Sequence, residues 1–406
     1  MAYEVTVPGV TAPGDHKGKI EKSPLAFTEA EYQSRVDATK QKMEEHSLDC
    51  MLVNEAGNIC YLTGYRALSD YVAQALVLYA NEPHPSFYLR RQDAPAAMYM
   101  CYMPNSNIVG YPEHYIGDYN VSGFDFIFDT LQARGGIKRV GVELDSLSAA
   151  TVATIKERFP DVELIDMSGV VMRQRLVKSP AEIQHLRDAS VITDKVMLDC
   201  YDFFKPGRRE CDVYADITAG LIRGTPEIGA MGFEAPNLPG GLQSGTSHIT
   251  WTEQLIENGK HYNPEFGAAR HNYFVGLMRT ISMGKPSDKL SDLYKYMVDG
   301  CNEAINVVKE GETLAAVAQK YCATVDKGGY WKDSRCGYPI GINWLEDSCS
   351  LRVDDPTVMT KGMVFHIMLG TWLYEDFGAI ISETFAVTEN GCEVFSKVPR
   401  ELIIID

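Results

Sequence analysis

The chain has 406 residues, of which 45% are hydrophobic and 23% are charged. This composition is ordinary for a folded globular protein and excludes a disordered or fibrous one. The 38 Lys and Arg residues against 55 Asp and Glu residues give a net charge of -17, so the average surface repels nucleic acid phosphates and anionic lipid. We therefore expect neither a nucleic acid nor a membrane as a partner.

The cysteines and the N-terminus predict a cytoplasmic protein. Ten cysteines are scattered through the chain without a C-x-x-C pair, which is typical of reduced, mostly buried thiols. The first residues lack the basic and apolar regions of a signal peptide, and no stretch approaches the roughly 18 apolar residues of a membrane span. Residues 1–25, rich in Pro, Gly and charge, predict an N-terminal arm that is either a free tail or packed on a partner subunit.

Helices alternating with strands predict an α/β domain over residues 26–171. A capped helix is expected to begin at Thr28, because Glu31 follows three residues later and apolar residues then recur at helical spacing. Short apolar runs bounded by turn residues predict the strands of this domain. The expected strands cover residues 49–55, 75–80, 86–90, 138–144 and 162–168, and a further helix covers 148–159.

A second, α+β domain is predicted over residues 172–406. Its long amphipathic helix is expected to begin at Ser179, because Ser-Pro is followed by Glu182 and apolar residues recur every three or four positions. Strands are expected to dominate the later part of this domain. The further helices cover residues 210–223, 287–309 and 312–328, and the strands cover 265–280, 362–369 and 379–391.

The sequence lacks several common catalytic signatures, namely H-E-x-x-H, G-x-x-x-x-G-K-[ST], G-x-S-x-G and a G-x-G-x-x-G after a strand. Segments along nearly the whole chain instead resemble the creatinase and methionine aminopeptidase family (M24), whose catalytic domain has the pita-bread fold. These segments occur in the family's order: NICYLTGY, RLVKSPAEIQHLRDA, SGTSHITW, EFGAARHNYFVGLMRTISMG, GYPIGI, KGMVFHIMLG and ISETFAVTENGCEVFS.

Peptidases of that family hold two metal ions with two Asp, one His and two Glu. The resemblance places these five ligand positions at Glu265, Gly276, Tyr338, Met368 and Ser382. Four of these five residues cannot bind a hard dication. A mononuclear site formed by Glu265 and His366 stays an alternative, but we predict a metal-free site that needs no cofactor.

Glu265 is the predicted catalytic carboxylate. The small and apolar residues that follow it, Phe266, Gly267 and Ala268, predict desolvation, which raises the pKa and the nucleophilicity of a carboxylate. Such a Glu attacks an electrophilic carbon or activates water. The alternative is that Glu265 is only a remnant of a lost metal site.

Other candidate residues surround this position in the family pattern. His248, in SGTSHITW, matches a His that transfers protons in the metal-free creatinases. His366 and Tyr338 are candidate catalytic hydrogen-bond donors to a developing charge. Trp251 and Trp372 either pack in the core or form an aromatic wall over a cationic ligand.

Two further residues complete the predicted substrate-binding set. Tyr71 lies in GYRALSDYVAQ, where Leu68 and Ala73 stand in place of the aromatic residue and the His expected from the resemblance. Glu383 is a poor substitute for the neighbouring metal-ligand position, because a shift of one residue along a strand turns the side chain to the opposite face. We expect the segment at 64–74 and the shortened loop at 343–350 to line or cover the pocket.

Within the family, GYPEHY, RQDAPAA, HITW, KDSRCGYPIGI, MVFHIM and VPREL resemble the ectoine hydrolases, which are metal-free cytosolic enzymes. The resemblance implies that the carboxylate at the Glu265 position attacks the cyclic amidine and forms a covalent intermediate, as in those enzymes. The resemblance implies a homodimeric hydrolase of ectoine, hydroxyectoine or another small zwitterion, with N-acetyl-diaminobutyrate as the product from ectoine. A lyase of the dimethylsulfoniopropionate type and a non-catalytic ligand-binding protein stay alternatives.

Overall fold

The computed structural model describes residues 20–118, 120–374 and 376–406, and the chain divides into two compact units between Gln174 and Arg175. The boundary expected from the sequence lies at 171. Most of the predicted N-terminal arm lies outside the described residues. Its described end is attached to the first unit, because Lys22 Nζ donates hydrogen bonds to the carbonyl oxygens of Cys101 and Met103 at 2.6 and 2.8 Å.

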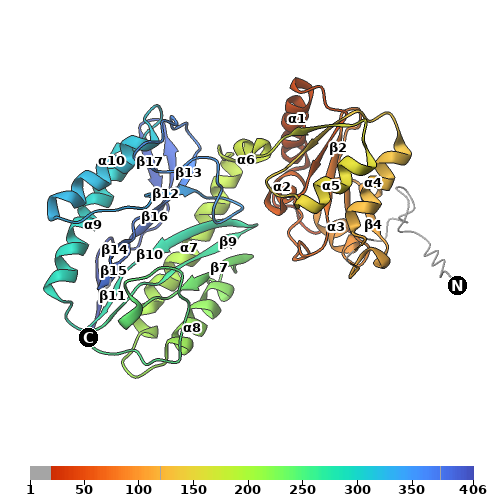
Figure 1. The fold of residues 1–406 in the computed structure, drawn as a ribbon. Helices are drawn as coiled ribbons and strands as arrows, with labels where there is room; N and C mark the ends of the chain where they lie inside the picture. Colours follow the sequence, from red (N-terminus) through yellow and green to blue (C-terminus); the bar gives the residue numbers. More distant parts are fainter. Residues whose placement is uncertain (1–19, 119, 375) are drawn as a thin grey trace. The chain divides into compact units, whose positions relative to one another are not determined.

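The first unit is an α/β layer, as its sequence pattern predicts. Six strands form one mixed sheet in the order β4-β3-β2-β1-β5-β6 (Figure 1). The strands are β1 (Cys50–Val53), β2 (Ala75–Tyr79), β3 (Ser86–Arg90), β4 (Ile108–Tyr111), β5 (Arg139–Val142) and β6 (Glu163–Asp166). The helices are α1 (Glu29–Glu45), α2 (Ala56–Thr63), α3 (Ala94–Met100), α4 (Gly123–Arg134) and α5 (Ala149–Arg158), with short 3-10 turns at Asn105–Asn107 and Glu113–Tyr115.

Local capping interactions explain where the helices of this unit begin. Thr28 caps α1, and its side-chain oxygen accepts the backbone N–H of Glu31 at 3.2 Å, as the sequence predicts. The pattern did not predict α4, which is capped reciprocally by Ser122 and Asp125. Apolar residues of α4 and α5, including Phe128 and Ile155, pack with residues of the sheet in one buried cluster.

The second unit contains helices at the expected places and more strands than expected. The helices are α6 (Val170–Arg175), which spans the boundary, α7 (Pro180–Phe203), α8 (Glu210–Arg223), α9 (Asp288–Val307) and α10 (Leu314–Val325), with 3-10 turns at Gly241–Gln243 and Asp326–Gly328. The strands are β7 (Gly232–Asn237), β8 (His261–Tyr262), β9 (Glu265–Arg270), β10 (Tyr273–Met278), β11 (Ile281–Met283), β12 (Gly337–Pro339), β13 (Val364–Met368), β14 (Thr371–Leu373), β15 (Phe377–Ala379), β16 (Ser382–Thr388), β17 (Gly391–Val394) and β18 (Ile403–Ile405).

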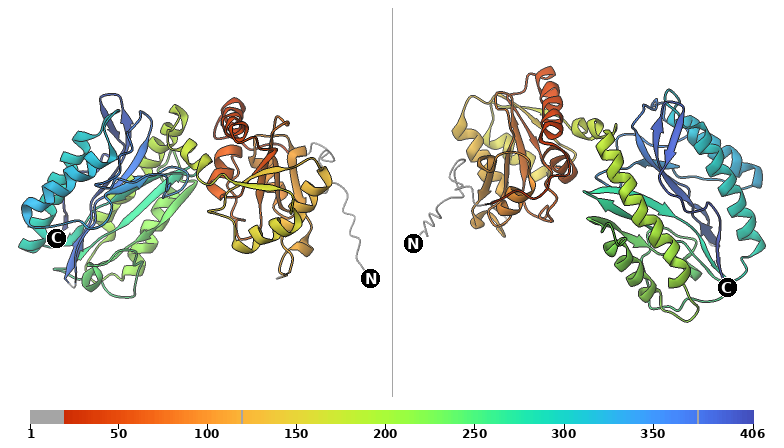
Figure 2. Two further views of the ribbon diagram at one scale, coloured as in Figure 1. Left: turned by 45° about the horizontal axis from the view of Figure 1, so that its top comes forward. Right: turned by 180° about the vertical axis from the view of Figure 1, so that it is seen from behind.

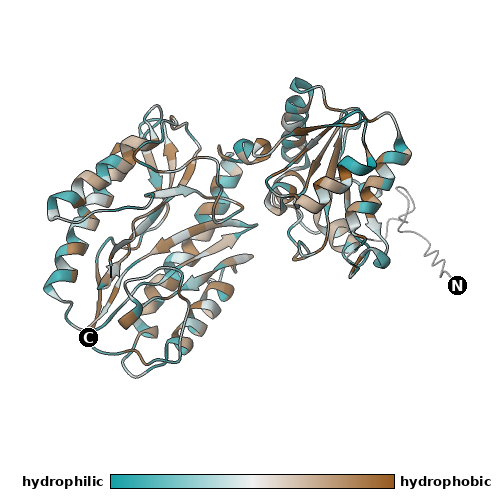
Figure 3. Ribbon diagram, in the orientation of Figure 1, coloured by the Kyte–Doolittle hydropathy of each residue, from teal (hydrophilic) through white to brown (hydrophobic). Residues whose placement is uncertain are grey.

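Two helix pairs enclose the strands of the second unit. Helices α7 and α8 share a buried cluster with β9, β10 and β11, whereas α9 and α10 share another with β13 and β16. Both views in Figure 2 show the strands between these helix pairs. Figure 3 shows hydrophobic colour along many strands and hydrophilic colour on outer parts of the helices. None of the helices in the described ranges is long and apolar enough to cross a membrane.

The strand pairing brings distant segments of the second unit together. The sheets have the orders β10-β9-β7, β12-β13-β16-β17, β18-β11-β8 and β14-β15. The first two sheets meet where the Thr384 side chain donates to the carbonyl oxygen of Gly276 at 2.9 Å and accepts its N–H at 3.2 Å. The two sheets therefore converge where β10 lies against β13 and β16.

Candidate active site

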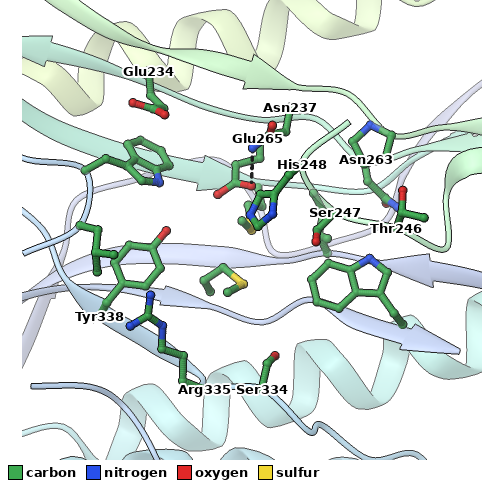
Figure 4. A pocket seen from close by; sticks show the side chains of 17 residues that line it. Glu234, Asn237, Thr246, Ser247, His248, Asn263, Glu265, Ser334, Arg335 and Tyr338 are labelled. Carbon is green, nitrogen blue, oxygen red and sulfur yellow. Dashed lines mark hydrogen bonds between the residues drawn. The ribbon is translucent and has the colours of Figure 1, made fainter. Parts of the chain in front are cut away.

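A cavity of about 440 Å³ lies at this convergence, inside the second unit. Of the eight residues predicted for the site, Glu265, His248, Tyr338 and Trp372 line it. Figure 4 shows Glu265 and Glu234 on one wall, with Arg335 and Ser334 facing them from the opposite wall. The cavity thus has carboxylates on one side and a guanidinium on the other.

Glu265 is the first residue of β9 and is only 9% exposed. Asn237, its partner in the neighbouring strand β7, donates its side-chain amide to Glu265 Oε2 at 3.2 Å. Burial raises the pKa of Glu265 to about 7, the hydrogen bond from Asn237 opposes this rise, and the charge of Glu234 adds to it. Near neutral pH, Glu265 therefore exists partly as a weakly solvated carboxylate, which is a reactive nucleophile or base.

His248 lies on the loop that follows β7, where Figure 4 shows it beside Glu265. Its imidazole is exposed, in contrast to that of His366. Its backbone has φ 58°, a left-handed conformation that a residue with a Cβ adopts at a cost of about 1–2 kcal/mol. An accessible imidazole at the edge of a cavity can exchange protons with both solvent and a bound molecule.

His366 does not line the cavity, which corrects its prediction as a direct hydrogen-bond donor. It is fully buried behind Tyr338, with its Nδ1 3.3 Å from the Tyr338 hydroxyl and its Nε2 2.8 Å from Ser382 Oγ. Burial lowers the pKa of His366 to about 3, so the imidazole is neutral. Burial and the charge of Glu265 raise the pKa of Tyr338, so its hydroxyl stays protonated and able to donate into the cavity.

The residues at the five family ligand positions do not fit a dinuclear metal centre. A Cβ at Gly276 would lie 2.7 Å from Trp344 Cη2 and 2.8 Å from His366 Cε1, so these two rings occupy the space that a carboxylate ligand needs. Within the described ranges, no group of three or more His, Cys, Asp or Glu residues is placed to hold a metal ion. The mononuclear site of Glu265 and His366 does not fit either, because both nitrogens of His366 already contact Tyr338 and Ser382.

Glu383 does not line the cavity, and its predicted role in substrate binding is corrected. Its Oε1 accepts hydrogen bonds from Arg279 at 2.8 Å and from Arg400 at 2.9 Å. Both Arg279 and Glu383 are buried. The side chain points away from the face that carries Ser382, as the period of two along β16 requires, and it forms a structural ion pair.

Trp251 and Tyr71 also do not line the cavity. The Trp251 ring is 47% exposed and contacts Tyr214 with 4.1 Å between ring centroids, so it neither lies in the core nor forms a wall of the cavity. Tyr71 belongs to the first unit, where it is 70% exposed and its hydroxyl lies 3.4 Å from a nitrogen of Arg90. Tyr71 is not among the residues that line the cavity of the second unit, so its predicted role in binding has no support there.

The loop at 343–350 contributes Trp344 and Leu345 to the cavity, as expected. A buried ion-pair cluster positions this loop. Glu346 Oε1 accepts from Arg175 at 2.6 Å, and Glu346 Oε2 accepts from Lys178 at 2.7 Å. Desolvation raises the pKa of Glu346, but the charges and hydrogen bonds of Arg175 and Lys178 outweigh it and the net pKa is lowered, so the Glu346 carboxylate stays ionised.

The sequence pattern did not identify Arg335, Glu234 or Asn237. The guanidinium carbon of Arg335 lies 4.9 Å from the ring centroid of Tyr338, and the signal for it was its place in KDSRCGYPIGI, a segment that resembles the ectoine hydrolases. Glu234 and Asn237 lie in β7, whose sequence GFEAPN contains Pro236 and shows no clear alternation. Because that strand was not predicted, its two cavity residues were not found.

Comparisons with known proteins identify the family. The chain matches the model of metallopeptidase family M24 over residues 184–389 and that of the creatinase/prolidase N-terminal domain over residues 35–177. An uncharacterized hydrolase/peptidase of Sinorhizobium fredii is 42% identical over 388 residues, covering 95% of this chain and 100% of that protein. The ectoine hydrolase of Halomonas elongata is 31% identical over 395 residues, covering 94% and 98% of the two chains.

Solved structures agree on the fold. The prolidase of Pyrococcus horikoshii matches with a TM-score of 0.79 at 22% identity, covering 91% of this chain and 100% of that one. This likeness confirms the predicted pita-bread fold behind a creatinase-like first domain. Together with the sequence relatives, it supports a hydrolase of this family. The chain therefore belongs to metallopeptidase family M24, with a creatinase/prolidase N-terminal domain preceding its catalytic domain.

Proposed function

We propose that this protein is a metal-independent hydrolase that opens a small cyclic amidine or amide zwitterion, with ectoine as the first candidate. The observation that carries the proposal is Glu265, a buried carboxylate of raised pKa at a cavity whose other family ligand positions have lost their metal-binding groups. The 31% identity to an ectoine hydrolase, over nearly the full length of both chains, supports ectoine as the substrate.

The proposed reaction begins with attack of Glu265 on the ring carbon between the two nitrogens. A carbon–oxygen bond forms, one ring carbon–nitrogen bond breaks, and the departing nitrogen leaves as an amine that carries a proton. Water then adds to the same carbon and the Glu265 carboxylate leaves, so that an amidinium ion and water become an amide and an ammonium group. Proximity of the buried carboxylate to the electron-poor carbon supplies much of the acceleration.

His248 and Tyr338 assist these steps in our proposal. His248 receives a proton from the attacking water and delivers one to the departing nitrogen, which its accessible position beside Glu265 supports. Tyr338, protonated and facing the cavity, donates a hydrogen bond to charge that develops at the reacting centre. In this proposal His366 acts only by donating its Nδ1–H to the Tyr338 hydroxyl oxygen, which leaves the Tyr338 proton for the ligand.

The charge distribution supports a zwitterion as the ligand. Arg335 faces the carboxylates across the cavity and is suited to bind a substrate carboxylate, because its planar guanidinium matches carboxylate geometry. Trp344 and Trp372 supply apolar wall between the two charged regions. A molecule with one positive and one negative end meets a complementary charge at each side of such a cavity.

Turnover of ectoine by chelator-treated protein, followed by proton NMR, tests the proposal. We expect N-acetyl-diaminobutyrate to form with the wild type, and its rate of formation to fall by at least about 10² for Glu265→Ala. The exposed Glu253, outside the cavity lining, provides a matched control as Glu253→Gln. Activity that is lost on chelation and restored by zinc or manganese would contradict metal independence.

Two other outcomes would change the assignment. If the folded wild type does not open ectoine but releases dimethyl sulfide from dimethylsulfoniopropionate, the protein is a lyase. If Glu265→Ala binds ectoine as the wild type does and neither protein turns it over, the protein is a ligand-binding member of the family.

The proposal includes a homodimer, which the family resemblance predicts. Sedimentation velocity at micromolar concentration measures this directly, and we expect a mass near twice the 45.2 kDa of the chain. A monomer at all concentrations would contradict this part and leave the chemistry at Glu265 unchanged.

A further inference from the structure

Glu234 reaches the cavity through an irregularity in β7. Glu234 pairs with Gly267 of β9 and Asn237 pairs with Glu265, with a shift of register between these two pairs. In a regular strand, residues three apart point to opposite faces of the sheet. The bulge removes this restriction, because an extra residue re-aims the side chains on one side of it. Both Glu234 and Asn237 therefore line the same cavity.

An aromatic surface lies next to Glu234. Its pairing partner Gly267 has no side chain, and a Cβ there would lie 2.6 Å from Trp344 Cζ3. The indole of Trp344 thus packs directly on the backbone opposite Glu234, and both residues line the cavity. A carboxylate beside an aromatic ring is a combination that attracts organic cations, through charge and through the electron-rich ring face.

The carboxylate of Glu234 has no protein cation or hydrogen-bond donor as a partner in the described ranges. Its side chain is half-buried, and burial raises its pKa. The guanidinium of Arg335 lies on the opposite wall in Figure 4 and contacts Tyr338, Ser350 and Asp347. A cationic ligand in the cavity would supply the partner that the protein does not give this carboxylate.

We propose that Glu234 is a specificity-determining residue that binds the N–H edge of a cationic ring beside Trp344 and so selects amidinium-type ligands over neutral amides. This inference rests on the proposed function and decides between the two ring classes that it leaves open. An amidinium presents N–H donors to the carboxylate in a charge-assisted pair. A neutral amide of the same shape presents a carbonyl oxygen instead of one of these donors, so that two acceptors face each other.

Benzamidine and benzamide test this inference, because they have nearly the same shape and differ in charge at neutral pH. Calorimetric titration of the wild type is expected to show at least about tenfold tighter binding of benzamidine. Glu234→Gln is expected to reduce this preference to less than about threefold, whereas the control Glu253→Gln keeps it. Glu234→Ala provides a second variant if the first does not fold, as judged by circular dichroism.

A wild type that binds the two probes equally would overturn the inference, and so would a preference that survives in Glu234→Gln. With ectoine, the variant is expected to raise KM at least about tenfold and to change kcat much less, which a purely structural role would not produce. If the wild type prefers benzamidine without opening ectoine, and Glu234→Gln loses that preference, the role of Glu234 stands and only ectoine is removed as the proposed substrate.

Discussion

Asn237 donates its side-chain amide to Oε2 of Glu265 at 3.2 Å across the paired strands β7 and β9. The hydrogen bond favours the ionised form of Glu265, whereas burial and the charge of Glu234 favour the protonated form. The reactive carboxylate therefore depends on a residue 28 positions earlier in the chain, in a strand that reaches it through a bulge.

Replacing Asn237 by Ala is expected to raise the pKa of Glu265 above about 7, because the hydrogen bond that lowers this pKa is removed. The acid limb of the profile of kcat/KM against pH then moves to higher pH. Activity at pH 7 falls several-fold and recovers toward pH 9. An acid limb that stays in place would show that Asn237 does not control this ionisation.

Replacing His248 by Gln is expected to lower kcat by about 10²–10⁴, the usual contribution of a positioned acid–base group. KM should change little, because the ligand-facing charges at Glu234 and Arg335 are untouched. His46→Gln, at an exposed position at the end of α1, is the matched control. Equal rates for both variants would assign proton transfer to another group.

Replacing Glu383 by Gln is expected to destabilise the fold by about 3–5 kcal/mol, because Arg279 then stays buried without its counter-charge. Urea unfolding measures this loss. The control is Glu389→Gln, which breaks an exposed pair with Lys361 and should have little effect. A raised KM without loss of stability would instead restore the substrate-binding role that the sequence suggested for Glu383.

Glu143 provides a prediction for the first unit. Its carboxylate accepts the N–H groups of Asn54 and Glu55 and the side-chain amide of Asn58 at 2.7–2.9 Å, yet burial outweighs these bonds and raises its pKa to about 7. The folded state thus holds the proton more tightly than the unfolded state. The resulting stability is present below the unfolded pKa of about 4.5 and is lost as the pH rises through about 7.

Urea unfolding of the wild type and of Glu143→Gln at pH 5.5 and pH 8 checks this sign. The contribution of Glu143 to the free energy of unfolding should be lower at pH 8, by about 1–3 kcal/mol. The Gln variant, which does not ionise, should lack this part of the pH dependence. The comparison between the two proteins cancels the effect of the other titrating groups, and identical pH dependence would contradict the prediction.

Sequence patterns predicted those features that depend on neighbours a few residues apart. The capped starts of α1 at Thr28 and α7 at Ser179 follow from side chains three residues apart. The opposite orientation of Glu383 relative to Ser382 follows from the strand period of two. The family motifs located Glu265, His248 and Tyr338, because each lies in a short segment that resembles the family at the level of sequence.

Tertiary structure alone decided which side chains meet at the cavity. The sequence by itself determined the family, the carboxylate at Glu265 and the loss of the metal ligands. It did not show that His366 lies behind Tyr338, or that β7 brings Glu234 and Asn237 to the same wall. The physical reason is that such contacts join strands paired across tens of residues, whose register and bulges arise from packing of the whole unit rather than from local periodicity.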